Sequence, residues 1–295
     1  MFENILGNDR IKTQLERDLR SRRLHHAYLF SGPDHIGKMA LAREFVSELR
    51  TGKAFDEKSP FASQWNAGEG PGLLIFFDRG ESLKVEEVKK IQQHVFRRTA
   101  EDSTSFCIIE NAERMTRSTA NSFLKILEEP SERFVFILTT RQEQKLLPTI
   151  RSRCVLFRFN ALPTSFVEHS LRTRSSDELL IQDIKKLSGG KIGLAVRLLS
   201  DKAFLERLAR LWDFAMLVME KDLPDLFTLA EHLSSDEFDK SDLLHFFRFL
   251  AEKLRQDHPR AHLPQLSNLQ RMRSLFQDTQ VNRRLQLEDY FLKNF

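Results

Sequence analysis

Two patterns of apolar residues alternate over the first half of the chain. Short unbroken apolar runs are typical of strands buried on both faces, whereas apolar residues three and four positions apart form one face of a helix. Their alternation predicts a parallel sheet covered by helices. The runs that we expect to form its five strands are 27–30, 73–77, 106–109, 134–138 and 155–157.

Stripes with helical spacing lie between these runs. We expect each stripe to face the core of the sheet, and none needs a ligand to explain it. The three stripes are Leu41, Phe45, Val46 and Leu49; Val85, Val88, Ile91 and Val95; and Ala120, Phe123, Leu124 and Leu127. The segment 53–71 is rich in Gly, Ser and Pro, and it is predicted to be a surface loop or an insertion.

The alternation stops around residues 161–164, and only helical patterns follow. After a small helical segment, two long stripes predict a helical bundle. Their residues are Phe204, Leu208, Leu211, Ala215 and Val218, and then Leu243, Phe247, Leu250 and Leu254. We therefore predict an α/β domain over residues 1–160, a small helical domain over 161–201 and an all-helical domain over 202–295.

Composition narrows the class of protein only slightly. Lys plus Arg exceeds Asp plus Glu by four (46 − 42), which permits contact with nucleic acid but does not argue for it, because both signs are interspersed. Cys107 and Cys154 lie far apart in or beside apolar runs, which favours free thiols in a reducing compartment over a disulfide or zinc site. The sequence has neither an apolar stretch of about 20 residues nor a signal-peptide pattern. We expect a cytoplasmic protein without membrane contact.

A phosphate-binding loop is predicted directly after the first strand. Gly32, Gly37 and Lys38 fit the pattern G-x-x-x-x-G-K, in which backbone N–H groups and the lysine bind phosphate. Met39, however, stands where such loops need Ser or Thr to hold Mg²⁺, and the bulky His35 stands where a small residue is usual. Two interpretations stay open: a vestigial loop kept as a tight turn, or weak nucleotide binding. Hydrolysis is not expected.

The residues after the third predicted strand also argue against hydrolysis. Active ATPases of this architecture place Asp and then Glu there, one for Mg²⁺ and one to polarise the attacking water. This chain has Glu110, a candidate to organise magnesium, followed by Asn111, which cannot accept a proton as a general base. Glu113 is a substitute base or an ordinary turn carboxylate. Thr139 and Thr140 follow the fourth strand, where a hydroxyl can orient water.

Four segments carry a resemblance to a known family. Residues 26–33 resemble the entry to the nucleotide loop of bacterial clamp-loader subunits, and residues 121–130 resemble the helix after their third strand. Residues 146–154 are similar to the segment that ends in their Ser-Arg-Cys motif, and residues 281–288 resemble the closing helix of the delta-prime collar. The chain thus resembles the AAA+ clamp-loader subunits of bacterial DNA polymerase III. The altered phosphate loop favours the delta-prime type over the motor subunits.

The resemblance implies an AAA+ domain, a helical lid and a collar that closes a pentameric ring. Arg153, matched within Ser152-Arg153-Cys154, would be an arginine finger in trans, although a surface arginine before an edge strand is the simpler alternative. The implied partners are gamma/tau-type motor subunits, a delta subunit, the sliding clamp and primer-template DNA. Such a subunit helps to load the clamp as part of the polymerase III complex without hydrolysing ATP. The helix at 121–129 would face clamp or DNA, or be plain solvated surface.

The sequence departs from the family at two sites of ligand chemistry. Many AAA+ members of the family carry a four-cysteine zinc module, but residues 50–72 contain no cysteine, so no zinc is expected. The position of the nucleotide-sensing arginine of the lid is taken by Gly193, and Lys191 or Arg197 would substitute only with unusual spacing. No cofactor is therefore required, and ATP or ADP binding is expected to be weak or absent.

The rival interpretation is an active P-loop ATPase, either a motor subunit or a remodelling enzyme. It would bind Mg-ATP through Lys38 and Glu110 without a loop hydroxyl, and it would use Glu113 as the base.

Overall fold

The computed structural model describes residues 2, 5–21, 23–78, 82–96, 104–129, 134–220, 222–257, 262–278 and 282–295. It divides into two compact units. Unit 1 comprises Met1–Ser170 and Gly189–Leu194, and unit 2 comprises Leu171–Ser188 and Ala195–Phe295. The domain boundaries at residues 160 and 201 stay a prediction.

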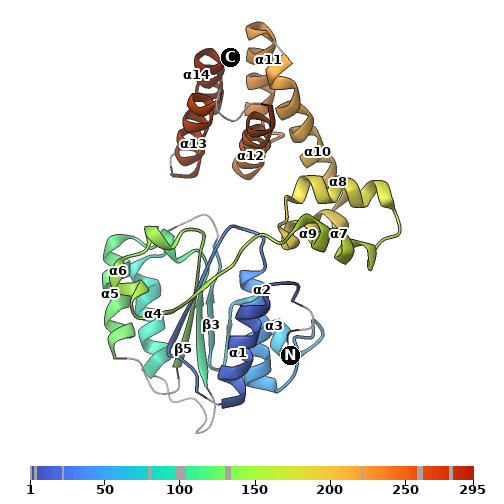
Figure 1. Ribbon diagram of the computed structural model, residues 1–295. Coiled ribbons are helices and arrows are strands. Elements are labelled where there is room, and N and C mark those ends of the chain that lie inside the picture. Colours follow the sequence, from blue (N-terminus) through green and yellow to red (C-terminus); the bar gives the residue numbers. More distant parts are fainter. Residues whose placement is uncertain are drawn as a thin grey trace. The chain divides into compact units, whose positions relative to one another are not determined.

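Unit 1 contains a sheet whose strand order is β2-β3-β4-β5-β1-β6 among the described residues (Figure 1). The strands are β1 (Ala27–Ser31), β2 (Glu69–Gly70), β3 (Leu73–Phe76), β4 (Ser105–Ile109), β5 (Phe134–Thr140) and β6 (Val155–Arg158). The five predicted strands are confirmed, and all pair in parallel. The sequence prediction missed β2, which pairs antiparallel with β3 and is too short to leave a periodic pattern.

Helices cover both faces of the sheet. They are α1 (Asp9–Ser21), α2 (Lys38–Thr51) and α3 (Pro60–Ala67), and then α4 (Val85–Phe96), α5 (Arg117–Glu128) and α6 (Pro148–Arg151). Side chains alternate along β1: Tyr28 and Phe30 join the apolar core of the first three helices, whereas Ala27 and Leu29 join that of the other three. The predicted stripes of α2, α4 and α5 contribute buried residues to these cores, while α1 was not predicted.

The prediction that residues 53–71 form a surface loop is wrong for residues 60–67 and 69–70, while the alternative of an insertion stays a prediction. Part of this segment folds into α3, whose N-cap Ser59 accepts a hydrogen bond from the backbone N–H of Ala62 at 3.1 Å. Phe61 and Trp65 lie one turn apart on α3, and both are buried in the core. The Gly, Ser and Pro residues that suggested a loop here include the caps of a short helix.

After β6, the described residues form helices and the turns between them. Helices α7 (Thr164–Arg172) and α9 (Ile192–Ser200) cross from one unit to the other, and unit 2 contains α8 (Glu178–Ser188), α10 (Lys202–Leu217), α11 (Leu223–Ser234), α12 (Lys240–Asp257), α13 (Leu263–Asp278) and α14 (Arg283–Asn294). Three-residue 3₁₀ helices are η1 (Ala112–Arg114), η2 (Glu143–Lys145) and η3 (Val218–Glu220). Helix α10 packs on α12, and α11 packs on α14. The two predicted stripes of this region are buried, which confirms its helical class.

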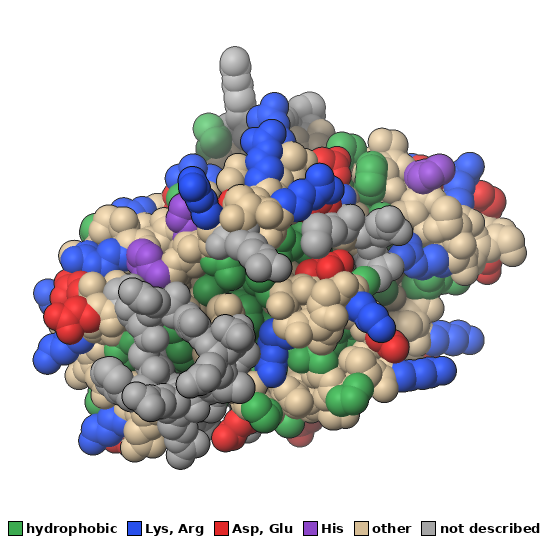
Figure 2. Space-filling view, turned by 90° about the horizontal axis from the view of Figure 1, so that it is seen from below, with side chains coloured by type: hydrophobic (Ala, Val, Ile, Leu, Met, Phe, Trp, Pro, Cys, Tyr) green, Lys and Arg blue, Asp and Glu red, His purple; other side chains and the backbone are tan. Residues whose placement is uncertain are grey.

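Charged side chains of both signs are exposed. On the face shown in Figure 2, Lys and Arg side chains lie at many separate points with acidic side chains between them. Among the described helices, none is long and apolar enough to cross a membrane.

Candidate functional site

The carboxyl ends of four parallel strands meet at one edge of the sheet. The phosphate loop follows β1, Arg141 follows β5, Glu110 follows β4, and Asp78 lies just after β3. Strand β1 lies inside the sheet between β5 and β6, so the chain reverses its direction of winding beside the loop. Ligands of open α/β sheets bind outside the carboxyl ends at such a reversal. We call this place the carboxyl edge.

Lys38, the first residue of α2, is turned back onto its own loop. Its ammonium group donates to the carbonyl oxygens of Gly32 at 2.5 Å and Pro33 at 2.7 Å, and the side chain is buried. Burial, partly opposed by the carboxylates of Asp34 and Glu113, lowers the pKa of Lys38 below its ordinary value. The two carbonyls satisfy the ammonium group within the loop itself.

Gly37 and His35 both adopt left-handed backbone conformations, with φ of 95° and 61°. The His35 carbonyl accepts a hydrogen bond from the backbone N–H of Gly193, in the first turn of α9, at 2.7 Å. A Cβ atom on Gly193 would lie 2.8 Å from that carbonyl oxygen, so a side chain there requires the loop to move. Met39 packs against the apolar core beside the loop. The predicted sensor position is thus occupied by a backbone contact.

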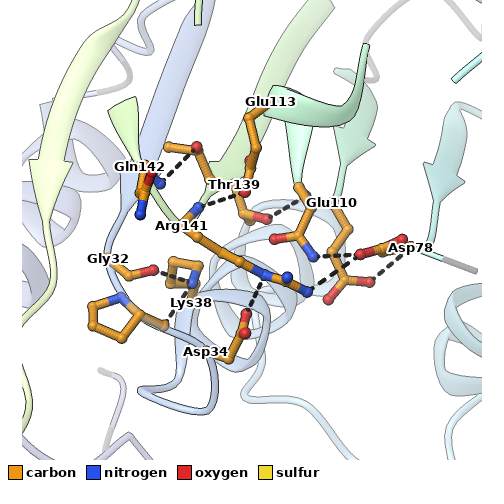
Figure 3. A network of polar contacts seen from close by, with 12 residues as sticks. Gly32, Asp34, Lys38, Asp78, Glu110, Glu113, Thr139, Arg141 and Gln142 are labelled. Atoms are coloured by element: carbon orange, nitrogen blue, oxygen red, sulfur yellow. Dashed lines mark hydrogen bonds and ion pairs between the residues drawn. The ribbon is translucent and has the colours of Figure 1, made fainter. Parts of the chain in front are cut away.

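An ion-pair network crosses the carboxyl edge (Figure 3). The Nε of Arg141 donates to Asp34 in the loop at 2.8 Å, and its Nη2 lies 3.5 Å from Asp78. Asp78 also accepts a 2.7 Å hydrogen bond from the Asn111 side-chain amide and lies 3.4 Å from the Nε of Arg114. Only 10% of the Asp78 side chain is exposed, against 40% for Asp34. Arg141 therefore links the phosphate loop to the ends of β3 and β4.

Glu110 and Asn111 both have structural partners. A Glu110 carboxylate oxygen accepts the backbone N–H of Asp78 at 3.0 Å. Burial is the main cause that raises the pKa of Glu110, and the nearby Asp78 carboxylate adds to it. Asn111 is buried with φ of 51°, and its backbone N–H donates to the Thr139 hydroxyl at 3.0 Å. The two residues join β3, β4 and β5 at their ends.

Glu113, the candidate substitute base, lies in η1 and accepts the backbone N–H of Arg141 at 3.0 Å. Its second carboxylate oxygen is buried without a hydrogen-bond partner. Thr139 and Thr140 are also buried, and the Thr140 hydroxyl accepts from the backbone N–H of Gln142 at 3.2 Å. These side chains support the path of the chain around Arg141.

Sequence reasoning missed Asp34, Asp78 and Arg141 as site residues. Two of these residues lie next to elements that the sequence predicted: Asp34 is within the loop motif, and Arg141 comes shortly after the predicted strand 134–138. What the sequence did not reveal is that they pair across 107 positions. No group of three or more His, Cys, Asp or Glu side chains suited to a metal occurs in the part of the chain that the structure describes.

Ser152, Arg153 and Cys154 lie at the opposite end of the sheet, which we call the amino edge. They connect α6 to the start of β6. Arg153 donates to the Thr149 carbonyl at 3.0 Å and to Glu128, the last residue of α5, at 2.8 Å. The Ser152 hydroxyl donates to the same carbonyl at 3.1 Å. Burial raises the pKa of the Cys154 thiol to about 12, so this group stays uncharged beside Arg153.

The remaining predicted residues lie outside both clusters. The guanidinium of Arg197 stacks on Phe204 at 3.8 Å within unit 2. Lys191 lies in the short stretch 189–194 of unit 1, two residues before Gly193. On α5, Asn121 and Lys125 are exposed, and whether this helix faces clamp or DNA stays a prediction.

The carboxyl edge has a strand, a glycine loop and a helix that begins with lysine, in the arrangement of a phosphate site. Its cationic groups are satisfied internally, and it lacks a loop hydroxyl for Mg²⁺. This sheet and loop, followed by a helical unit, define the AAA+ class of P-loop proteins. The chain belongs to the family described as DNA polymerase III, delta subunit, which matches residues 7–163.

Curated relatives agree with this family. The chain is 32% identical over 190 residues to DNA polymerase III subunit tau/gamma of Haemophilus influenzae. The aligned stretch covers 62% of this chain and 27% of that protein. It is 32% identical over 179 residues to DNA polymerase III subunit delta' of Bacillus subtilis. Here the aligned stretch covers 59% of this chain and 52% of that protein. The chain therefore spans between about a quarter and a half of these relatives. These relatives are gamma/tau and delta' subunits of DNA polymerase III, in agreement with the family match.

Solved structures show the same fold. The chain superimposes on a DNA polymerase III, gamma subunit-related protein from Thermotoga maritima with a TM-score of 0.57 and 18% identity, covering 95% of this chain and 98% of that one. A RuvB variant from the same organism gives a TM-score of 0.51 with 15% identity, covering 98% and 88%.

Proposed function

We propose that this chain is a delta-prime-type clamp-loader subunit that does not hydrolyse ATP and lends Arg153 to a neighbouring motor subunit. The observation that carries the proposal is the Asp34–Arg141 ion pair, which occupies the carboxyl edge where the phosphates of a nucleotide would lie. The partly exposed Arg153 at the amino edge complements it.

Three features argue against hydrolysis at the chain's own loop. The Asp34 carboxylate would repel phosphate oxygens, and Arg141 and Lys38 already bond to protein oxygens. Met39 packs in the core and offers no oxygen to Mg²⁺. Asn111 is a hydrogen-bond donor to Asp78 and cannot take a proton from water. Weak or absent ATP and ADP binding follows, with no cofactor, zinc or other metal required.

The position of Arg153 supports action in trans. In the register of β6 with β1, Val155 pairs with Tyr28 and Arg158 pairs with Ser31, beside the loop. The start of β6 is therefore roughly 10 Å from the carboxyl edge at about 3.3 Å per residue. Arg153 lies further back still, and its guanidinium bonds to groups at the amino edge. Its charge is consequently available to another chain rather than to its own loop.

The proposed setting is cytoplasmic, within a DNA polymerase III clamp loader. Partners are gamma/tau-type motor subunits, a delta subunit, the sliding clamp and primer-template DNA. Helix α5 is the candidate surface for clamp or DNA. The chain closes one end of the ring through its helical unit, while Ser152 and Cys154 hold the backbone on either side of the finger.

The test is the DNA- and clamp-stimulated ATPase activity of the reconstituted loader, measured beside the isolated chain. Arg153→Ala is compared with Arg153→Lys and with Arg20→Ala, an exposed arginine on α1. We expect no turnover by the isolated chain, and a loss of roughly 10³–10⁵ at the one motor site that receives the finger. The whole loader should therefore lose at least that site's share of turnover. Lysine should restore little, because it lacks the guanidinium fork.

Each contrary result has a definite meaning. Turnover by the isolated chain would make this an active P-loop ATPase. An unchanged rate with Arg153→Ala, in an intact loader, would leave the chain as a scaffold without a finger.

A further inference from the structure

Glu128 and the Thr149 carbonyl hold the Arg153 guanidinium at two points. Glu128 is the last residue of α5, and Thr149 lies in α6, which packs against α5. One contact uses the Nη1 group at 3.0 Å, and the other uses the Nη2 group at 2.8 Å. Two anchors on different elements fix both the position and the plane of a planar group.

The contacts leave much of the guanidinium unused. Arginine has five N–H donors, and two of them are engaged here, so three remain (5 − 2). The Arg153 side chain is 34% exposed, and that of Glu128 is 50% exposed. A phosphate can therefore approach the free donors while the anchors stay in place.

We propose that Glu128 is a positioning residue for Arg153, which it holds ready for the phosphates of a neighbouring subunit's nucleotide. This inference rests on the proposed function of Arg153 as a finger. A long side chain loses rotational freedom when it engages a ligand, and that cost slows or weakens the contact. A side chain that is already oriented in the free subunit has met most of the cost beforehand.

The chain itself supplies a matched control. Glu129 follows Glu128 directly, is exposed, and has no hydrogen bond or ion pair among the described residues. A change at Glu129 removes the same charge one residue away without touching Arg153. Glu128→Gln is the conservative variant, because the amide oxygen can still accept the Nη2 donor.

The first measurement uses the isolated full-length chain and does not depend on ATP. Nitrogen-15 NMR of the arginine side chains reports rotation about the Nε–Cζ bond. We expect separate, slowly exchanging Nη signals for Arg153 in the wild type, in Glu128→Gln and in Glu129→Ala. In Glu128→Ala the two signals should merge. Separate signals in Glu128→Ala would overturn the proposed anchor.

The second measurement is the stimulated ATPase activity of the reconstituted loader. The finger-dependent rate is the difference between the wild type and Arg153→Ala. We expect Glu128→Ala to lower that rate by about threefold to tenfold, corresponding to the ordering of one long side chain. Glu128→Gln should keep at least half of it, and Glu129→Ala should keep nearly all. Neither variant at Glu128 should change the rate when Arg153 is already Ala.

The outcomes separate the role of Glu128 from that of Arg153. A loss in Arg153→Ala with an unchanged or faster Glu128→Ala overturns the positioning role alone, and a faster rate would mean that the carboxylate restrains the finger. No loss in Arg153→Ala removes the proposed function and this role together.

Discussion

Arg141 and Arg153 lie at opposite ends of one parallel sheet and have similar exposure, 33% and 34%. Arg141 is bound between two carboxylates from different parts of the chain, and one of them, Asp78, is nearly buried. Arg153 is bound by one half-exposed carboxylate and one carbonyl. Exposed area therefore does not distinguish an arginine that closes a site from one that is available to a partner. The charge and burial of its two partners do.

The comparison also explains why one sheet can support two opposite roles. The carboxyl edge gathers loops from β1, β3, β4 and β5, so that a single cation can link several of them. Strand β6 is an edge strand of the sheet. Just before it, the Arg153 side chain bonds to one group of α5 and one of α6. Three predictions sharpen this contrast through the stability of unit 1.

The largest effect is expected from Asp78→Ala, which removes the common partner of Arg141, Arg114 and Asn111. Loss of a buried acceptor for several donors should lower the free energy of unfolding by about 2–3 kcal/mol. Asp34→Ala, at the exposed end of the network, should cost about 1 kcal/mol or less. Urea unfolding measures both in a Trp212→Phe background, where the fluorescence of Trp65 reports on unit 1 alone.

Equal losses for the two aspartate variants would mean that the network has no buried centre. The contrast between the two edges would then rest on the arginines alone.

An intermediate effect is expected from Arg141→Ala. It should lower the free energy of unfolding by about 1–2 kcal/mol, because Asp78 keeps its contacts with Asn111 and Arg114. Arg153→Ala should cost less than about 0.5 kcal/mol, since its ion pair is exposed. The same unfolding assay compares them. Similar losses at both positions would contradict the distinction between a closed edge and an open one.

The smallest effect is a pH dependence at Glu110. Its pKa in the folded protein is raised above the ordinary value of 4.5, so the folded state holds the proton more tightly than the unfolded state. Stability therefore falls as the pH rises from about 4.5 through the folded pKa, and it is constant above that. Relative to Glu110→Gln, which does not titrate, the free energy of unfolding of the wild type should fall between pH 4 and pH 7, by less than the other variants in this series cost.

Parallel pH curves for the two proteins would show that burial does not act on Glu110. Urea unfolding at four or five pH values in the same tryptophan background is sufficient to decide.

The architecture was largely predictable from the sequence, because apolar runs and stripes of adequate length carry a clear period. The five parallel strands and the stripes of α2, α5, α10 and α12 were confirmed for this reason. The elements that were not predicted are either very short or have a composition typical of loops. Strand β2 has two residues, and α3 lies among Gly, Ser and Pro residues, although Phe61 and Trp65 one turn apart were a usable signal.

The site was predictable only in part. Lys38, Glu110 and Asn111 were assigned to one nucleotide-site motif from the sequence, and the structure places all three at the carboxyl edge. The pairing of Asp34 with Arg141, and that of Glu128 with Arg153, depend on which strand ends and helix ends become neighbours. Strand order determines that, and no local pattern encodes it.

The hydrogen bond from Gly193 to His35 has a consequence for how this protein can change over evolutionary time. The bond joins two backbones, so it depends on the path of the His35 backbone, and the positive φ of that residue favours types such as Asn or Gly. Gly193 has no such freedom, because any Cβ atom meets the carbonyl. An arginine at that position would require the loop to move, so a single substitution there would also change the phosphate-loop backbone.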